Sequence, residues 1–148
     1  MDGRIVILNG PNLNWLGKRD VTLYGTLSME QVMLDIQRCY PDVYFTYYQS
    51  NHEGDLIDQL QLPLEPEREH VAGIVLNAGG YSHTSVALRD AVALCPVPVV
   101  EVHITDISQR ETFRRVSLLT DVCAHSIIGH GTNGYLEAVQ WLLEHKNS

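Results

Sequence analysis

Long apolar runs, cysteine pairs and positive charge are all scarce in this sequence of 148 residues. The longest apolar runs, such as Val97–Val100, fall far short of the ~20 residues that a membrane-spanning helix needs, so no contact with a membrane is expected. The three cysteines contain no CxxC pair, which fits a reducing compartment, and the segment from Met1 to Arg4 has no signal-peptide pattern. We therefore expect a cytoplasmic protein.

The net charge of −8 opposes the basic surface that binding to DNA or RNA requires. Nucleic acid is therefore not expected as a partner. Ten residues are cationic, and most of them are Arg rather than Lys. If the ligand is a small anion, the chain has planar guanidinium groups that can hold a carboxylate through two hydrogen bonds.

Hydrophobic residues make up 45% of the chain and charged residues 19%, which is typical of a globular protein. A chain of this length can bury a core without help from a metal or disulfides. Residues 1–148 are therefore expected to form a single domain.

Short β-branched and apolar stretches alternate with segments whose apolar residues recur at helical spacing. The first stretch ends at Gly10-Pro11 like a buried parallel strand, and Ser28 with Gln31 fits a capping box at the start of a helix. The pattern then predicts helix 29–40, strand 43–49, helix 53–62, strand 71–77, helix 82–94, strand 97–104, a short helix from Ser108, strand 122–128 and helix 132–145.

This alternation predicts an α/β fold, a single flavodoxin-like, doubly wound, five-stranded parallel sheet with helices on both faces. Ligands of such folds bind outside the carboxyl ends of the strands. A long irregular segment after the first strand, Leu13–Thr26, is a candidate lid. The predicted strand ends are polar, namely Asn9–Asn12, Ser50–Glu53, Asn77–Gly80 and Glu101–Thr105.

Glu101 and His103 are two positions apart on a predicted strand, so both side chains project from the same face of the sheet near its carboxyl edge. There the carboxylate can orient the imidazole to donate a proton. The structural alternative is that His103 caps the strand end and Glu101 pairs with an Arg. Backbone N–H groups from Thr105 onward suit a bound carboxylate.

Arg19 and Tyr24 lie in the candidate lid, between Gly17 and Gly25, which can act as hinges. A phenol is a weak base, but a guanidinium within about 4 to 6 Å favours the phenolate. The alternative is that both side chains decorate a solvated loop.

His83 and Asp90 share one stripe of the predicted helix 82–94, but about 10.5 Å of axial rise separates them. One small ligand cannot easily touch both in the same subunit, and a hydrated helix face explains them equally well. Arg110 and Arg114 share a face of the predicted short helix that can point across the strand ends, although such a pair is usually solvated.

The sequence indicates neither a metal-binding site nor a lysine placed to form a Schiff base. The seven His include no HExxH, and only Cys123 adds to His125 and His130 as a candidate ligand. Lys18 lies in the lid and Lys146 at the terminus, away from the predicted strand ends. No metal is expected.

Six segments of the sequence, taken in chain order, closely resemble the type II 3-dehydroquinate dehydratases, and the resemblance covers essentially the whole chain. The resemblance implies a hydro-lyase without a cofactor that removes water from 3-dehydroquinate by anti elimination through an enolate, giving 3-dehydroshikimate. The pathway is either shikimate-dependent aromatic amino acid biosynthesis or quinate breakdown, and the family's usual assembly is a dodecamer of four trimers. The segments are Ile7–Asn14, Gly17–Gly25, Ser50–Gly54, Tyr81–Asp90, Glu101–His103 and Arg110–Arg114.

The resemblance also implies roles for single residues. Tyr24, activated by Arg19, would take the proton next to the ketone, and Asn12 would hold a water that stabilises the enolate oxygen. His103, oriented by Glu101, would protonate the departing hydroxyl. The substrate-binding positions would be Asn77, His83, Asp90, Ile104, Thr105 and Arg114, with Asp90 reaching the site of a neighbouring subunit and Arg110 in the active-site region.

Several residues depart from the family's usual pattern. Val21 and Ala78 replace proline, so we expect the lid and the loop after the third strand to be more mobile than usual. None of the departures is the proposed acid or base. The others are Asp106, Ser108, Ser126 and His130.

Three other protein classes fit this fold. A flavodoxin needs a phosphate loop after the first strand, where Pro11 removes a donor, and a response-regulator receiver needs an acidic pocket, whereas these strands end in Asn9 and Asn77. A non-catalytic binding protein would be expected to lack Arg19, Tyr24 or His103.

Overall fold

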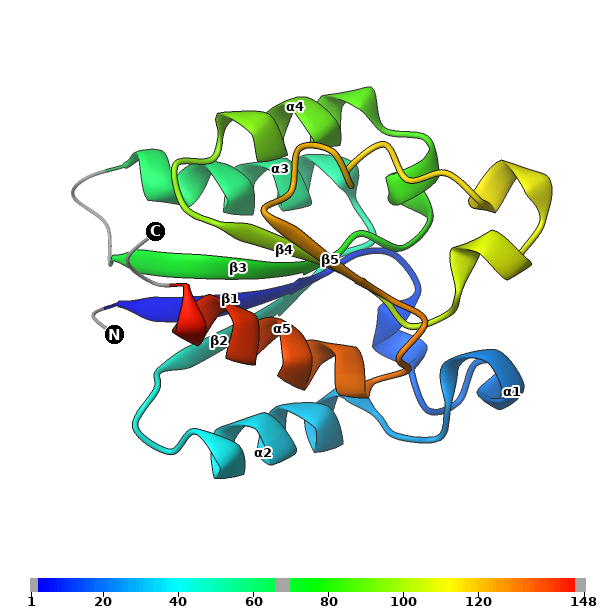
Figure 1. The fold of residues 1–148 in the computed structure, drawn as a ribbon, viewed down its shortest axis with the longest axis horizontal. Helices are drawn as coiled ribbons and strands as arrows, with labels where there is room; N and C mark the ends of the chain where they lie inside the picture. Colours follow the sequence, from blue (N-terminus) through cyan, green and yellow to red (C-terminus); the bar gives the residue numbers. More distant parts are fainter. Residues whose placement is uncertain (1–2, 66–69, 146–148) are drawn as a thin grey trace.

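The computed structural model describes residues 3–65 and 70–145, which form one sheet with helices on both sides (Figure 1). All five strands of this described part are parallel, in the order β2-β1-β3-β4-β5, so the expected α/β, flavodoxin-like fold is confirmed. The strands are β1 (Arg4–Asn9), β2 (Phe45–Gln49), β3 (Val71–Asn77), β4 (Val99–His103) and β5 (His125–Ile128). The helices are α1 (Val21–Tyr24), α2 (Met29–Cys39), α3 (Glu53–Gln61), α4 (Val86–Leu94) and α5 (Asn133–Glu144).

Different helices cover the two faces of the sheet. Ile5 and Ile7 of β1 pack with α2 and α5, whereas Val6 and Leu8 pack with α3 and α4. Figure 1 shows these two helix pairs on opposite sides of the strands. Because β1, β3 and β4 are buried on both faces, they read in the sequence as mostly apolar runs.

Two helix starts have side-chain caps. Ser28 accepts a hydrogen bond from the backbone N–H of Gln31, and the Gln31 side chain accepts one from the backbone N–H of Ser28, so the expected capping box of α2 is confirmed. Ser85 accepts from the backbone N–H of Leu88 and thereby begins α4 at Val86.

The prediction of one helix over 82–94 is therefore wrong at its start. Gly79–His83 forms a separate 3-10 turn, η3, before the chain becomes extended at Ser85. His83 does not lie on α4, and its predicted stripe with Asp90 does not exist.

The short helix predicted from Ser108 is also wrong. Two 3-10 turns, η4 (Ile107–Gln109) and η5 (Thr112–Arg114), take its place, because Asp106 caps η4 and the backbone is extended at Arg110. Arg110 and Arg114 therefore do not share a helix face. The fifth strand begins at His125 rather than 122, since a turn occupies the preceding residues.

The carboxyl ends of β1 and β3 come together at the point where the chain connections diverge. The backbone N–H of Gly10 donates to the carbonyl of Asn77 at 2.7 Å. A Cβ atom at Gly10 would lie 2.4 Å from the carbonyl oxygen of Ala78, so this close approach requires glycine.

The candidate lid follows β1 and contains the one-turn helix α1. Leu13 and Leu16 anchor it in the core, whereas Val21 and Leu23 are exposed. Figure 1 shows α1 and the segment with η4 and η5 extending from the same end of the sheet. None of the helices in the described ranges is long and apolar enough to cross a bilayer.

Candidate active site

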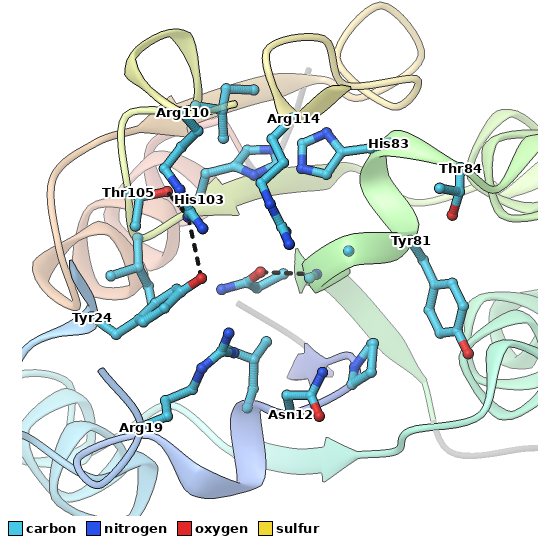
Figure 2. Close-up of a pocket in the computed structure, with 17 residues that line it drawn as sticks. Asn12, Arg19, Tyr24, Tyr81, His83, Thr84, His103, Thr105, Arg110 and Arg114 are labelled. Atoms are coloured by element: carbon cyan, nitrogen blue, oxygen red, sulfur yellow. Dashed lines mark hydrogen bonds between the residues drawn. The ribbon is translucent and has the colours of Figure 1, made fainter. Parts of the chain in front are cut away.

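A cavity of about 320 Å³ opens at the carboxyl ends of β1, β3 and β4, beneath the lid (Figure 2). The fold brings most of the predicted site residues to it from four separate parts of the chain. Those that line it are Asn12, Arg19, Tyr24, Asn77, His83, His103, Ile104, Thr105, Arg110 and Arg114.

Tyr24, at the end of α1, directs its hydroxyl into the cavity (Figure 2). The guanidinium carbon of Arg19 lies 3.9 Å from the centre of the phenol ring, which is a cation–π contact. Arg110 Nη1 donates to the phenol oxygen at 3.2 Å and to Thr105 Oγ1 at 3.1 Å. Two cations therefore contact one phenol, Arg19 at the face of the ring and Arg110 at the oxygen.

Arg110 is held in place by more than the phenol. Its side chain is 14% exposed, and its Nε lies 3.4 Å from Glu111 Oε1. Burial by itself lowers the pKa of Arg110, but the hydrogen bond to Tyr24 and the charge of Glu111 raise it overall. The group therefore stays cationic in the site.

His103 lines the cavity and is bonded on its buried side to Glu101, with 2.6 Å between Nε2 and Oε2. The two side chains lie on the same face of β4, as predicted. Because the carboxylate accepts, Nε2 is the protonated nitrogen, and Nδ1 is left for exchange with a ligand.

Three hydroxyls complete the surroundings of Glu101, and we call them the hydroxyl cage. Thr120 Oγ1 and Ser126 Oγ donate to Oε1 at 2.7 and 2.8 Å, and Ser117 Oγ donates to Oε2 beside His103. Burial alone would raise the pKa of Glu101, yet the hydrogen bonds from His103, Ser117 and Thr120 lower it to about 2. Glu101 is thus a carboxylate with four donors.

His83 is oriented by the backbone of the loop after η5. Its Nδ1 lies 2.9 Å from the carbonyl oxygen of Val116, so Nδ1 carries a proton and Nε2 remains for a ligand. The ring centres of His83 and His103 are 6.2 Å apart. His83 is the last residue of η3, and Ser85 separates it from the start of α4.

Asn12 begins the lid in a left-handed conformation, with φ of 70°. Its backbone N–H donates to Asn51 Oδ1 at 3.0 Å, and Gln49 Nε2 donates to the same oxygen at 3.1 Å. Tyr81, which also lines the cavity, donates its hydroxyl to the Asn51 carbonyl at 2.9 Å. Asn51 thus ties the loops after β1, β2 and β3 together.

The electrostatics of the cavity oppose those of the whole chain. Arg19, Arg110 and Arg114 line it within a protein of net charge −8. Arg114 Nε donates to Glu111 Oε2 at 3.0 Å, so Glu111 contacts both Arg110 and Arg114. This arrangement suits an anionic ligand with a carboxylate or several oxygens.

Two predicted site residues lie outside the lining of the cavity. Glu101 is 1% exposed and contacts His103, which lines the cavity. Asp90 is exposed on α4 and does not reach the cavity of its own chain. Lys146, which the sequence places at the terminus, lies outside the described residues.

Sequence reasoning missed the hydroxyl cage and the bond from Arg110 to Tyr24. Ser126 had a usable signal, because a polar residue inside a predicted strand that neighbours β4 can face Glu101, and the two are register partners. Ser117 and Thr120 lie in a loop without a pattern. Between residues 3–65 and 70–145, no group of three His, Cys, Asp or Glu is arranged to hold a metal.

The chain matches the family model described as Dehydroquinase class II over residues 3–143. It is 48% identical to a 3-dehydroquinate dehydratase of an Exiguobacterium species, covering 96% of this chain and 95% of that protein. It is 41% identical to the 3-dehydroquinate dehydratase of Campylobacter jejuni, covering 95% and 87%.

Two crystal structures agree with this match. The type II dehydroquinase of Butyrivibrio crossotus superposes with a TM-score of 0.88 at 38% identity, covering 96% of this chain and 98% of that one. The type II dehydroquinase of Propionibacterium acnes gives 0.87 at 29% identity, covering 97% and 98%.

Proposed function

Because the chain belongs to the class II dehydroquinase family, we propose that it removes water from 3-dehydroquinate by anti elimination through an enolate, giving 3-dehydroshikimate. One observation supports this most: a single cavity holds both a phenol that contacts two guanidiniums and an imidazole that is hydrogen-bonded to a carboxylate. The elimination needs both, since a proton next to a ketone is weakly acidic and hydroxide is a poor leaving group.

Tyr24 is the proposed base. As a phenolate, it takes the proton from the carbon next to the ketone, and Arg19 and Arg110 stabilise the negative charge of its oxygen and ring. The electron pair of the broken C–H bond forms the enolate. Asn12, at the start of the lid, is proposed to hold a water that stabilises the enolate oxygen.

His103 is the proposed acid. Collapse of the enolate expels the hydroxyl, which takes a proton from Nδ1 of the doubly protonated imidazole and leaves as water. Glu101 holds Nε2–H and balances the positive charge of the ring. After the product leaves, the Tyr24 phenol releases its proton to solvent and the His103 imidazole takes one up from solvent, so the enzyme returns to its starting state.

The remaining predicted residues are proposed to bind the substrate. Their donors suit its carboxylate, ketone and hydroxyls, and Arg114 supplies a positive charge. We propose that no cofactor or metal takes part, because acid, base and enolate stabilisation come from the chain itself. The proposed contacts are Asn77, His83, Ile104, Thr105 and Arg114.

Assembly and cellular role are proposed on the family likeness alone. Residues 1–148 would form one catalytic domain in a cytoplasmic dodecamer of four trimers, with Asp90 of one subunit completing a neighbour's site. The shikimate pathway of aromatic amino acid biosynthesis is the proposed setting, and quinate breakdown is the alternative for the same reaction.

An ultraviolet assay of the purified protein with 3-dehydroquinate tests the proposal, because the product is a conjugated enone. We expect turnover in the wild type and in Tyr44→Phe, whose exposed side chain lies outside the cavity. Tyr24→Phe should lose at least about 100-fold in kcat with little change in KM. A folded wild type that binds but does not turn over would be a binding protein, and the proposed function would be wrong.

A further inference from the structure

A series of four hydrogen-bonded polar side chains, three of them buried, runs beneath the floor of the cavity. The hydroxyl of Tyr135 donates to Asn9 Oδ1 at 2.9 Å and accepts from Asn77 Nδ2 at 2.9 Å. Asn9 Nδ2 in turn donates to the Tyr47 hydroxyl at 3.4 Å. Of these four residues, the proposed mechanism uses only Asn77.

The fold brings these groups together at the divergence point of the sheet. Asn9 and Asn77 are the last residues of β1 and β3, and they are register partners. Tyr135 lies in the first turn of α5, on the helix-covered face that both amides share. One phenol with no exposed surface therefore links the ends of two strands.

The direction of each hydrogen bond is determined by how many protons the groups have. Burial raises the pKa of Tyr135, so its oxygen keeps a single proton. That proton goes to Asn9 Oδ1, and the phenol oxygen must then accept from Asn77. Only the amino end of the Asn77 amide can donate, so Tyr135 selects one of its two orientations.

A second contact selects the same orientation. Asn77 Oδ1 accepts from the backbone N–H of Gly79 at 3.2 Å. A flipped Asn77 amide would place two donors together at Gly79. At Tyr135 it would leave the single phenol proton shared between two acceptors, Asn9 Oδ1 and Asn77 Oδ1. Such buried mismatches cost free energy, because a buried donor or acceptor without a protein partner cannot form a hydrogen bond with water either.

The amide nitrogen of Asn77 has a second hydrogen, which makes no hydrogen bond with the residues that the structure describes. Asn77 is 4% exposed and lines the cavity. We propose that Tyr135, itself oriented by Asn9, is a positioning residue that makes Asn77 present an N–H donor to the substrate. The substrate atom at this place must then be an acceptor oxygen. The inference rests on the proposed function, in which Asn77 contacts the substrate.

Tyr135→Phe tests the inference, since it removes the hydroxyl and keeps the ring. We expect kcat/KM for 3-dehydroquinate to fall about tenfold, the loss of roughly one hydrogen bond to the substrate. Val139→Ala is the matched control, because Val139 is buried one turn further along α5 and its truncation destabilises the same core. It should lower Tm while kcat and KM stay at wild-type values.

A double-mutant cycle separates positioning from general destabilisation. If Tyr135 acts through Asn77, Tyr135→Phe costs nothing further in kcat/KM when Asn77 is already Ala. Should Tyr135→Phe not fold, Asn9→Leu replaces it in the cycle, since it removes the acceptor that directs the Tyr135 proton. The same loss and the same non-additivity are expected.

Three results would overturn the inference in an active wild type. They are a Tyr135→Phe enzyme that matches Val139→Ala in kcat and KM, additive losses with Asn77→Ala, and an Asn77→Ala enzyme with full activity. A wild type without any dehydratase activity overturns the proposed function instead, so the two failures are distinguishable.

Discussion

Arg110 donates a hydrogen bond to the hydroxyl of Tyr24 from 86 positions away in the sequence. Arg19, only five positions from Tyr24, lies over the ring and not beside the oxygen. The two guanidiniums therefore act on different parts of the phenol. Arg110 is placed where the negative charge of a phenolate is greatest, and Thr105 helps to hold it there.

This contact predicts that Arg110 contributes directly to turnover. Arg110→Gln should lower kcat at least tenfold, because a hydrogen bond to a charged group contributes about 1.5–3 kcal/mol. Arg38→Gln is the control, since Arg38 is exposed on α2 and pairs with Asp35. Steady-state kinetics of both variants check this, and unchanged kcat in Arg110→Gln would assign the activation to Arg19 alone.

His103 and Glu101 should behave as one unit. We expect His103→Ala to reduce kcat by about 100-fold or more and Glu101→Gln to reduce it less. Because Glu101 reaches the cavity only through His103, the double variant should be no slower than His103→Ala. Additive losses in kcat would mean that Glu101 has a separate structural role.

The hydroxyl cage predicts a catalytic effect from a residue outside the cavity. Thr120→Val keeps the shape of the side chain but removes one of four donors to Glu101. We expect kcat to fall a few-fold, KM to change little, and Thr120→Ser to restore activity. Ile5→Val serves as the stability control, because it shortens a buried side chain near the start of β1, away from the cavity. Equal kcat in Thr120→Val and Thr120→Ser would contradict this role.

Glu101 should also make folding stability depend on acid pH. Its pKa of about 2 in the folded protein lies below the ordinary value, so its contribution is complete above about pH 4.5 and is lost as pH falls toward 2. The contribution is on the order of 3 kcal/mol. Urea unfolding at pH 6 and pH 3.5 should show a smaller decrease for Glu101→Gln than for the wild type. In Asp58→Asn, which removes an exposed carboxylate of α3, the decrease should match that of the wild type.

Asp90 should act across a subunit interface. It is exposed on α4 and does not line the cavity of its own chain, yet it lies in Tyr81–Asp90, one of the six segments that resemble type II 3-dehydroquinate dehydratases. We expect Asp90→Ala to lower activity. A co-refolded mixture of Asp90→Ala and Tyr24→Phe subunits should regain part of it, because some sites combine an intact Tyr24 with a neighbour's intact Asp90. Mixed assemblies that are confirmed by mass and remain inactive would exclude this role.

Much of the fold was predictable because its signals are local. The apolar strands, the capping box of Ser28 and the alternation of elements each depend on residues near one another in the chain. The predicted helices 82–94 and from Ser108 were wrong because side-chain caps and extended residues interrupt segments whose local pattern favours a continuous helix. Ser85 caps α4 three residues later than the predicted start, and the segment after β4 breaks into two turns around an extended Arg110.

The candidate site was predictable as a set of residues but not as a set of contacts. Asn12, Tyr24 and His103 could be placed at one edge of the sheet, because parallel strands end there together. The partners of these residues come from loops and helices that have no periodicity. The sequence therefore indicated which groups could react, but not that Arg110 would bind the Tyr24 hydroxyl.

The sequence by itself determined the α/β class, the strand ends and the face of β4 shared by Glu101 and His103, since these follow from repeat periods of two and 3.6 residues. Only the tertiary structure decided that Ser126 of β5 would face Glu101 and that Tyr135 of α5 would join Asn9 to Asn77. Such contacts depend on which elements become neighbours and at what register. Burial then requires every polar group at those positions to find a partner, and this determined the direction of each hydrogen bond around the site.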